Sequence, residues 1–289
     1  MFIIEPLYWM FKTENFKEHF LFLLKFGFIS YLLAFLIQFF LMNYIGLDKL
    51  VLHVVLQVVS FILFVSPCLL LSGYFWCLTD NIIDREQVAR ANDVYDGHVD
   101  FANKIKLPDL DVGRFIWRGI SALVATIIMC LPLAFLVYLF VTNFDAILQF
   151  WQLDYAYSAF IGVVIFVVLG SIVPALLWNY ARRDSVFAPL NIFKASYIIS
   201  SYPLKYFTNV FLFIIYTALQ AYIVSVLFGV LGISTIISGL SLSVFSSSLS
   251  GAIFGVSTII LIVLTYIINI YWSFVISYLL GTIAPPSEY

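Results

Sequence analysis

Charged residues are scarce in this sequence, because Asp, Glu, Lys and Arg together make up only 10% of its 289 residues. A soluble domain carries roughly a quarter of its residues charged, so this chain lacks the side chains that would cover a water-exposed surface. Hydrophobic residues make up 63% of the sequence, and the mean hydropathy is +1.06. The composition therefore predicts a single integral membrane domain over residues 1–289, with the bilayer as its solvent.

Other scarcities exclude or weaken further classes of function. A net charge of −2 is too small for a protein that binds nucleic acid. The three cysteines, Cys68, Cys77 and Cys130, lie in or at the end of apolar runs without metal-ligand spacing, which is typical of free thiols used in packing. No Asp, Glu, Lys or Arg lies at the middle of an apolar run, which argues against a proton- or ion-coupled transporter.

Long apolar runs are what the sequence has instead, and they predict an all-α polytopic fold with six spanning helices. The expected spans are Leu21–Met42, Leu50–Leu78, Ile116–Val141, Tyr155–Tyr180, Tyr206–Gly229 and Ala252–Leu280. Ahead of them, residues 1–20 mix Trp9, Phe16 and Phe20 with Lys and Glu side chains. This mixture predicts a short amphipathic helix that lies in the membrane interface.

The basic residues give the expected orientation. Of the 14 Lys and Arg residues, 13 lie at the N-terminal side (Lys12, Lys17 and Lys25), in or beside the polar connection 79–115, or in the second polar connection 181–205. Only Lys49 lies in a connection on the opposite side. The positive-inside rule then predicts that both termini and both polar connections face the cytoplasm, across a prokaryotic inner membrane.

A few polar side chains lie inside the expected spans, where each needs a partner away from lipid. His53 and Gln57 are four residues apart on one face of the second span, which predicts a hydrogen-bonded contact between helices. Gln38, Gln220 and Asn269 read as isolated positions in the sequence.

Prolines and glycines mark further features of the spans. Pro67, Pro132 and Pro174 lie inside spans and are expected to kink them. The uncharged, serine-rich run 232–255 ends in Gly251-x-x-x-Gly255, a spacing that lets helix backbones approach closely. We interpret this run either as a re-entrant or outer-face loop packed on other helices, or as a docking surface for another membrane protein.

Short motifs before the first span, near the end of the second and at the start of the third carry a family resemblance. They are Pro6, Phe11, Lys12 and Lys17, then Gly73-Tyr74, then the segment Leu107–Ile120 with the sequence LPDLDVGRFIWRGI. Together they resemble a family of bacterial and archaeal polytopic membrane proteins known only as a domain of unknown function. The resemblance implies a multi-helix membrane fold and no particular reaction.

The polar segment Asp80 to Arg118 is the most densely charged part of the chain, with 8 of the 16 acidic residues and 6 of the 14 basic ones. It contains the pattern N-D-x-x-D-x-x-x-D, formed by Asn92, Asp93, Asp96 and Asp100. This pattern resembles the first aspartate-rich motif of the intramembrane prenyltransferases, which bind a prenyl diphosphate through Mg²⁺. Carboxylates three or four residues apart share one helix face and can bridge Mg²⁺ to diphosphate oxygens.

Other features of the chain disagree with that enzyme class. The resembled enzymes use a second aspartate-rich motif in their other half, whereas the corresponding connection here offers only Asp184. They also have about nine spans, and their motif grows out of a membrane helix, whereas polar residues flank Asn92 on both sides. We therefore favour a solvated acidic face on a cytoplasmic helix over a metal site.

The favoured function is that of a non-catalytic multi-pass membrane protein without a cofactor, either a subunit or scaffold of a larger membrane assembly or a lipid-contacting module. Its expected partners are membrane lipids and other membrane protein subunits, which its aromatic-rich surface of 30 Phe, 18 Tyr and 6 Trp would contact. The alternatives are a Mg²⁺-dependent enzyme that acts on a prenyl diphosphate or another lipid phosphate, and a passive or lipid transporter.

Overall fold

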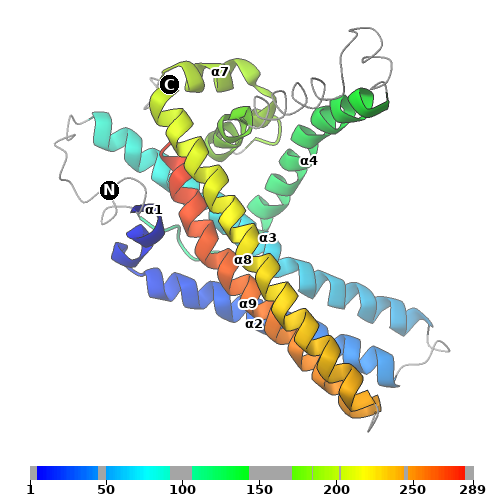
Figure 1. Ribbon diagram of the computed structural model, residues 1–289. Coiled ribbons are helices and arrows are strands. Elements are labelled where there is room, and N and C mark those ends of the chain that lie inside the picture. Colours follow the sequence, from blue (N-terminus) through cyan, green and yellow to red (C-terminus); the bar gives the residue numbers. More distant parts are fainter. Residues whose placement is uncertain are drawn as a thin grey trace.

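All regular structure in the described part of the chain is helical, which confirms the all-α prediction. The computed structural model describes residues 5–44, 50–91, 106–142, 171–183, 185–201, 203–243 and 247–283. In chain order its helices are α1 (Glu5–Tyr8), η1 (Trp9–Lys12), α2 (Phe16–Tyr44), α3 (Leu50–Ala91), α4 (Val112–Thr142), an unlabelled helix over residues 171–183, η4 (Ala188–Leu190), α7 (Ile192–Ser201), α8 (Pro203–Ser243) and α9 (Ser247–Gly281) (Figure 1).

Five helices in these residues are long and apolar enough to cross a bilayer. They contain the candidate spans Phe16–Leu41, Leu50–Asp84, Val112–Pro132, Pro203–Gly229 and Val256–Gly281. Only 17–33% of the most apolar part of each span is buried inside the protein, so most of its apolar surface is left for lipid. The chain is therefore an integral membrane protein. The remaining expected span, Tyr155–Tyr180, is the fourth in chain order and lies mostly outside the described residues, which include only its last part in helix 171–183.

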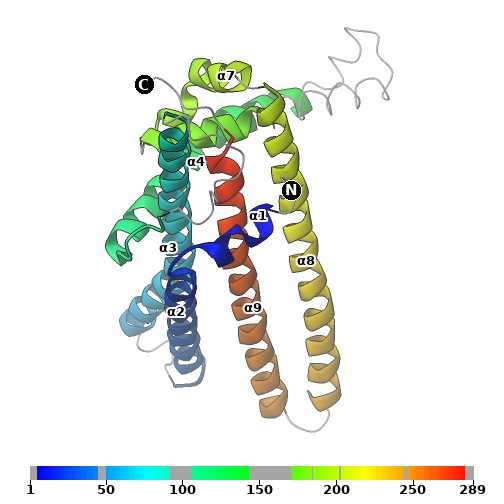
Figure 2. The ribbon, with the colours of Figure 1, turned by 90° about the vertical axis from the view of Figure 1, so that its left-hand side faces the viewer.

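The helices are arranged around two antiparallel pairs, α2 with α3 and α8 with α9, and α9 contacts both helices of the first pair (Figure 1). The end of α2, the start of α3 and the tip of the α8–α9 pair lie toward one end of the molecule, whereas α7 lies at the opposite end (Figure 2). α4 packs on α3 and then runs in a different direction from the two pairs (Figure 1).

Two helical regions are longer than the apolar runs predict. α3 continues to Ala91, so the first part of the expected polar connection 79–115 is helical. α8 continues to Ser243 and α9 begins at Ser247, so most of the serine-rich run is helical and the loop interpretation of it is wrong. A helix satisfies its own backbone hydrogen bonds, which is the arrangement a bilayer demands of an uncharged segment.

The N-terminal segment differs from the single amphipathic helix expected over residues 1–20. It forms the short turns α1 and η1, and α2 begins only at Phe16. Asn15 separates them with a φ of 62°, in the left-handed region that Asn tolerates better than most residues. Trp9 is fully buried and stacks on Tyr278 of α9 with 5.4 Å between ring centroids, so this segment packs on protein. Figure 2 shows α1 lying across α9.

Candidate functional site

α3 and α4 cross at backbone contact, and two glycines permit this. A Cβ atom added at Gly73 would lie 1.7 Å from the carbonyl oxygen of Phe115. One added at Gly119 would lie 2.0 Å from the carbonyl oxygen of Leu69. Each helix therefore presents a glycine to the backbone of the other, as small residues do where membrane helices approach closely. Both glycines come from the motifs that carry the family resemblance, and the fold brings these motifs together.

This crossing places Arg118 of α4 in a buried position beside α3. Its side chain is only 5% exposed, and Nη2 lies 3.6 Å from Oδ2 of Asp80. The same Nη2 donates a hydrogen bond of 2.9 Å to the carbonyl oxygen of Ala181, and Nη1 donates one of 3.4 Å to Sγ of Cys77. The planar guanidinium can hold several partners at fixed angles, which a Lys could not do.

Helix 171–183 completes this ion-pair network. Nη1 of Arg182 lies 3.7 Å from Oδ1 of Asp80 and also donates a hydrogen bond to Oδ1 of Asp84. The hydroxyl of Tyr180 donates a hydrogen bond of 3.2 Å to the carbonyl oxygen of Arg118. The network thus joins three helices. A buried ion pair is weak evidence for net stability, but breaking it leaves a charge uncompensated, so the network favours one arrangement of these helices.

A second buried polar contact joins α3 to α2. The hydroxyl of Tyr74 on α3 forms a hydrogen bond of 3.1 Å with Nδ1 of His19 on α2. The Tyr74 ring packs against Phe115 and Phe274, with centroid separations of 5.3 Å and 5.6 Å. This cluster ties α2, α3, α4 and α9 together at one level.

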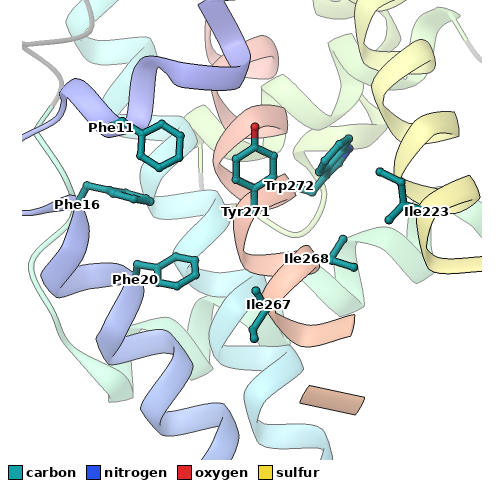
Figure 3. Close-up of a pocket in the computed structure, with 8 residues that line it drawn as sticks. All are labelled: Phe11, Phe16, Phe20, Ile223, Ile267, Ile268, Tyr271 and Trp272. Atoms are coloured by element: carbon teal, nitrogen blue, oxygen red, sulfur yellow. The ribbon is translucent and has the colours of Figure 1, made fainter. Parts of the chain in front are cut away.

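An open cleft of about 380 Å³ lies on α9, with the N-terminal segment and α2 on one side and α8 on the other (Figure 3). Its lining residues are all apolar or aromatic: Phe11, Phe16, Phe20, Ile223, Ile267, Ile268, Tyr271 and Trp272. In Figure 3 the three phenylalanine side chains project toward α9, and the α9 side chains form the floor.

The few polar atoms on the cleft residues are already paired with protein. The hydroxyl of Tyr271 donates a hydrogen bond of 2.9 Å to the carbonyl oxygen of Leu7. Nε1 of Trp272 donates one of 2.8 Å to the carbonyl oxygen of Tyr216. The surface left for a ligand is therefore hydrocarbon and aromatic ring, which suits an apolar chain and offers a polar metabolite nothing to bind.

Of the predicted polar pair His53 and Gln57, it is Gln57 that makes a hydrogen bond to another helix. Gln57 accepts a hydrogen bond of 3.2 Å from Nε2 of Gln38 on α2, and the same Nε2 donates one of 3.0 Å to Ser60. The contact between helices therefore involves Gln57. Nδ1 of His53 is buried and has no hydrogen-bond partner among the described residues.

The interpretation of Gln38, Gln220 and Asn269 as isolated residues is wrong. Gln38 has the partners on α3 described above, and Nε2 of Gln220 donates a hydrogen bond of 2.7 Å to Oδ1 of Asn269. The two partners are 49 residues apart in the chain and meet because α8 and α9 pack antiparallel. Local sequence carries no signal of this pairing.

The remaining predicted residues fall into three groups. Asn92, Asp93, Asp96 and Asp100 lie outside the described residues. Gly251 and Gly255 lie in α9, but their packing is outside the described part of the structure. Pro67 lies inside α3, Pro132 inside α4 and Pro174 in helix 171–183, and the kinks expected there stay predictions.

Sequence reasoning missed both the ion-pair network and the cleft. Asp80 and Arg118 are the two ends of the polar segment singled out in the sequence, and that was the available signal for the network. The cleft depends on how the N-terminal segment folds back on α9, and nothing in the sequence indicated that packing. Within the described ranges, no three His, Cys, Asp or Glu side chains lie close enough to hold a metal ion.

Comparison with known proteins adds no family, because no family model, curated protein sequence or solved structure matches this chain. The resemblances to membrane protein families therefore stay predictions.

Proposed function

We propose that this protein is a non-catalytic multi-pass membrane protein that holds the acyl chain of a membrane lipid in the cleft on α9. The lining of that cleft carries the proposal. Phe16, Ile223 and Ile268 each come from a different candidate span, so the cleft lies within the membrane-spanning part of the chain. Its volume of about 380 Å³ lies within the range of about 300–1,000 Å³ typical of small-molecule sites.

The wall formed by the N-terminal segment supports a lipid as the occupant. Phe11, on this wall, is 65% exposed and is followed directly by Lys12, whose Nζ lies 5.3 Å from the centre of the Tyr8 ring. Aromatic and basic side chains together are typical of the membrane interface. The lipid tail would occupy the cleft while its headgroup stays near Lys12.

We also propose that both termini face the cytoplasm across a prokaryotic inner membrane, and that the chain belongs to the family that its motifs resemble. The distribution of basic residues supports the orientation. α7 and the tip of the α8–α9 pair lie at opposite ends of the molecule, which fits it (Figure 2). The sequence motifs around Gly73 and Gly119 are the support for family membership.

Filling the cleft tests the lipid proposal. Ile268→Trp places a larger ring in the cleft, and Ile260→Trp puts the same ring at a half-exposed position of α9 that does not line it. After gentle extraction, mass spectrometry of the intact protein is expected to show a retained lipid in the wild type and in Ile260→Trp. Ile268→Trp should lose it. Equal retention in all three proteins would contradict the proposal.

A further inference from the structure

α7 lies crosswise to α8 at the end of the molecule where α8 begins (Figure 2). One face of this helix packs on protein, because Ala195 is fully buried and Ile198 is 3% exposed. The opposite face carries Phe193 and Tyr197, which are 90% and 48% exposed. α7 therefore carries apolar side chains on its outward face as well as on its inward face.

The segments on either side of α7 continue this apolar surface. Its exposed large side chains are Phe187, Leu190, Ile192, Phe193, Tyr197 and Leu204. None of these residues lines the apolar cleft, so this surface is separate from the proposed lipid-tail site. We call it the α7 surface.

The α7 surface lies in a basic part of the chain. Residues 171–205 contain Arg182, Arg183, Lys194 and Lys205 but only one acidic residue, Asp184. Burial lowers the pKa of Lys194, and the positive charges of Arg183 and Arg182 lower it further. Lys194, which lies 11 and 12 residues after Arg183 and Arg182 in the chain, is therefore close enough to both to feel their charge. Asp80 and Asp84 of α3 offset Arg182 through the ion-pair network.

We propose that the α7 surface docks on the headgroup layer of an anionic phospholipid leaflet. Exposed aromatic and aliphatic side chains beside Lys and Arg form the pattern of helices that lie in the membrane plane. Charge complementarity selects the occupant, because a basic cluster attracts anionic headgroups over zwitterionic ones. The apolar side chains enter the boundary between headgroups and acyl chains, and Arg183 and Lys194 contact phosphate groups.

Hydrogen exchange of the full-length protein tests this proposal. The protein is placed in nanodiscs of phosphatidylcholine alone or of phosphatidylcholine mixed with phosphatidylglycerol, and backbone exchange is measured over residues 192–201. Exchange is expected to be slower in the anionic mixture, by roughly fivefold for each basic side chain that reaches the surface. High salt should reduce this difference.

Two variants separate charge from fold. Arg183→Gln with Lys194→Gln should abolish the difference between the lipid mixtures while exchange in α9 stays unchanged. Lys106→Gln removes a highly exposed cation in the segment before α4 and should leave the difference intact. Identical exchange of wild-type α7 in both mixtures would overturn the proposal, as would a difference that survives the double substitution. A negative result in this experiment would not contradict lipid retention in the cleft, which mass spectrometry tests separately.

Discussion

A methyl group at the α3–α4 crossing should separate these helices. In Gly73→Ala the new Cβ would start 1.7 Å from the Phe115 carbonyl oxygen and must reach at least 3.0 Å. The obstacle is backbone, which cannot rotate away, so the helices must move apart by about 1.3 Å at this point. Overpacking of this kind costs about 1–3 kcal/mol.

The same displacement would affect Arg118. Its hydrogen bond to the Ala181 carbonyl is 2.9 Å long, and a shift of more than 1 Å would break it unless helix 171–183 follows. Hydrogen bonds to charged groups contribute about 1.5–3 kcal/mol. We therefore expect Gly73→Ala to lower the free energy of unfolding by about 4 kcal/mol. Gly119→Ala should have a similar effect, and the double variant should cost less than the sum, because one displacement relieves both clashes.

Thermal unfolding in detergent measures the loss, and the thiol of Cys77 reports its cause. Cys77 is 1% exposed and lies beside Arg118, whereas Cys68 and Cys130 are exposed on the lipid-facing surface of their spans and serve as references for a membrane-permeant thiol reagent. Modification of Cys77 should accelerate in the variant. Gly229→Ala is the matched control, because a Cβ there meets nothing within 4 Å. If Gly73→Ala is as stable as Gly229→Ala and its Cys77 thiol is still protected from modification, the backbone contact between α3 and α4 is refuted.

Three further predictions follow from the polar residues. Arg118→Met should lower stability by about 1.5–3 kcal/mol in the same unfolding assay, because the Ala181 carbonyl loses its charged donor and Asp80 keeps only Arg182 of its two guanidinium partners; an unchanged melting temperature would argue against the network. Gln220→Leu and Asn269→Leu should each cost about 0.6–2 kcal/mol, and the double variant no more than the costlier single one, as a double-mutant cycle would show. Asp93→Ala with Asp96→Ala should leave membrane level and folding unchanged. If wild-type protein binds a prenyl diphosphate only with Mg²⁺ and this variant does not, the enzyme interpretation replaces ours.

The sequence predicts well those structural features that depend only on the contact of side chains with lipid. Apolar runs identify the spans, because hydropathy measures the transfer of side chains from water to hydrocarbon. Helix ends are predicted less well, because a helix can continue into polar sequence, as α3 does to Ala91. Hydropathy carries no information on that continuation.

Contacts between distant segments lie beyond such reasoning. Gln220 and Asn269 each look unpaired until the α8–α9 pair brings them together. The cleft requires Asn15 to adopt a positive φ and Trp9 to pack on α9, and neither follows from local composition. Gly73 and Gly119 were visible as motifs, but only the fold shows that they face each other.

The α8–α9 pair also has a consequence for how the protein enters the bilayer. No Asp, Glu, Lys or Arg occurs between Lys205 and Glu288, so the whole helical hairpin can cross without carrying a charge through hydrocarbon. Lys205 and the cations before it remain as the anchor that sets its direction. Biogenesis of this half of the protein can therefore proceed as insertion of one preformed hairpin.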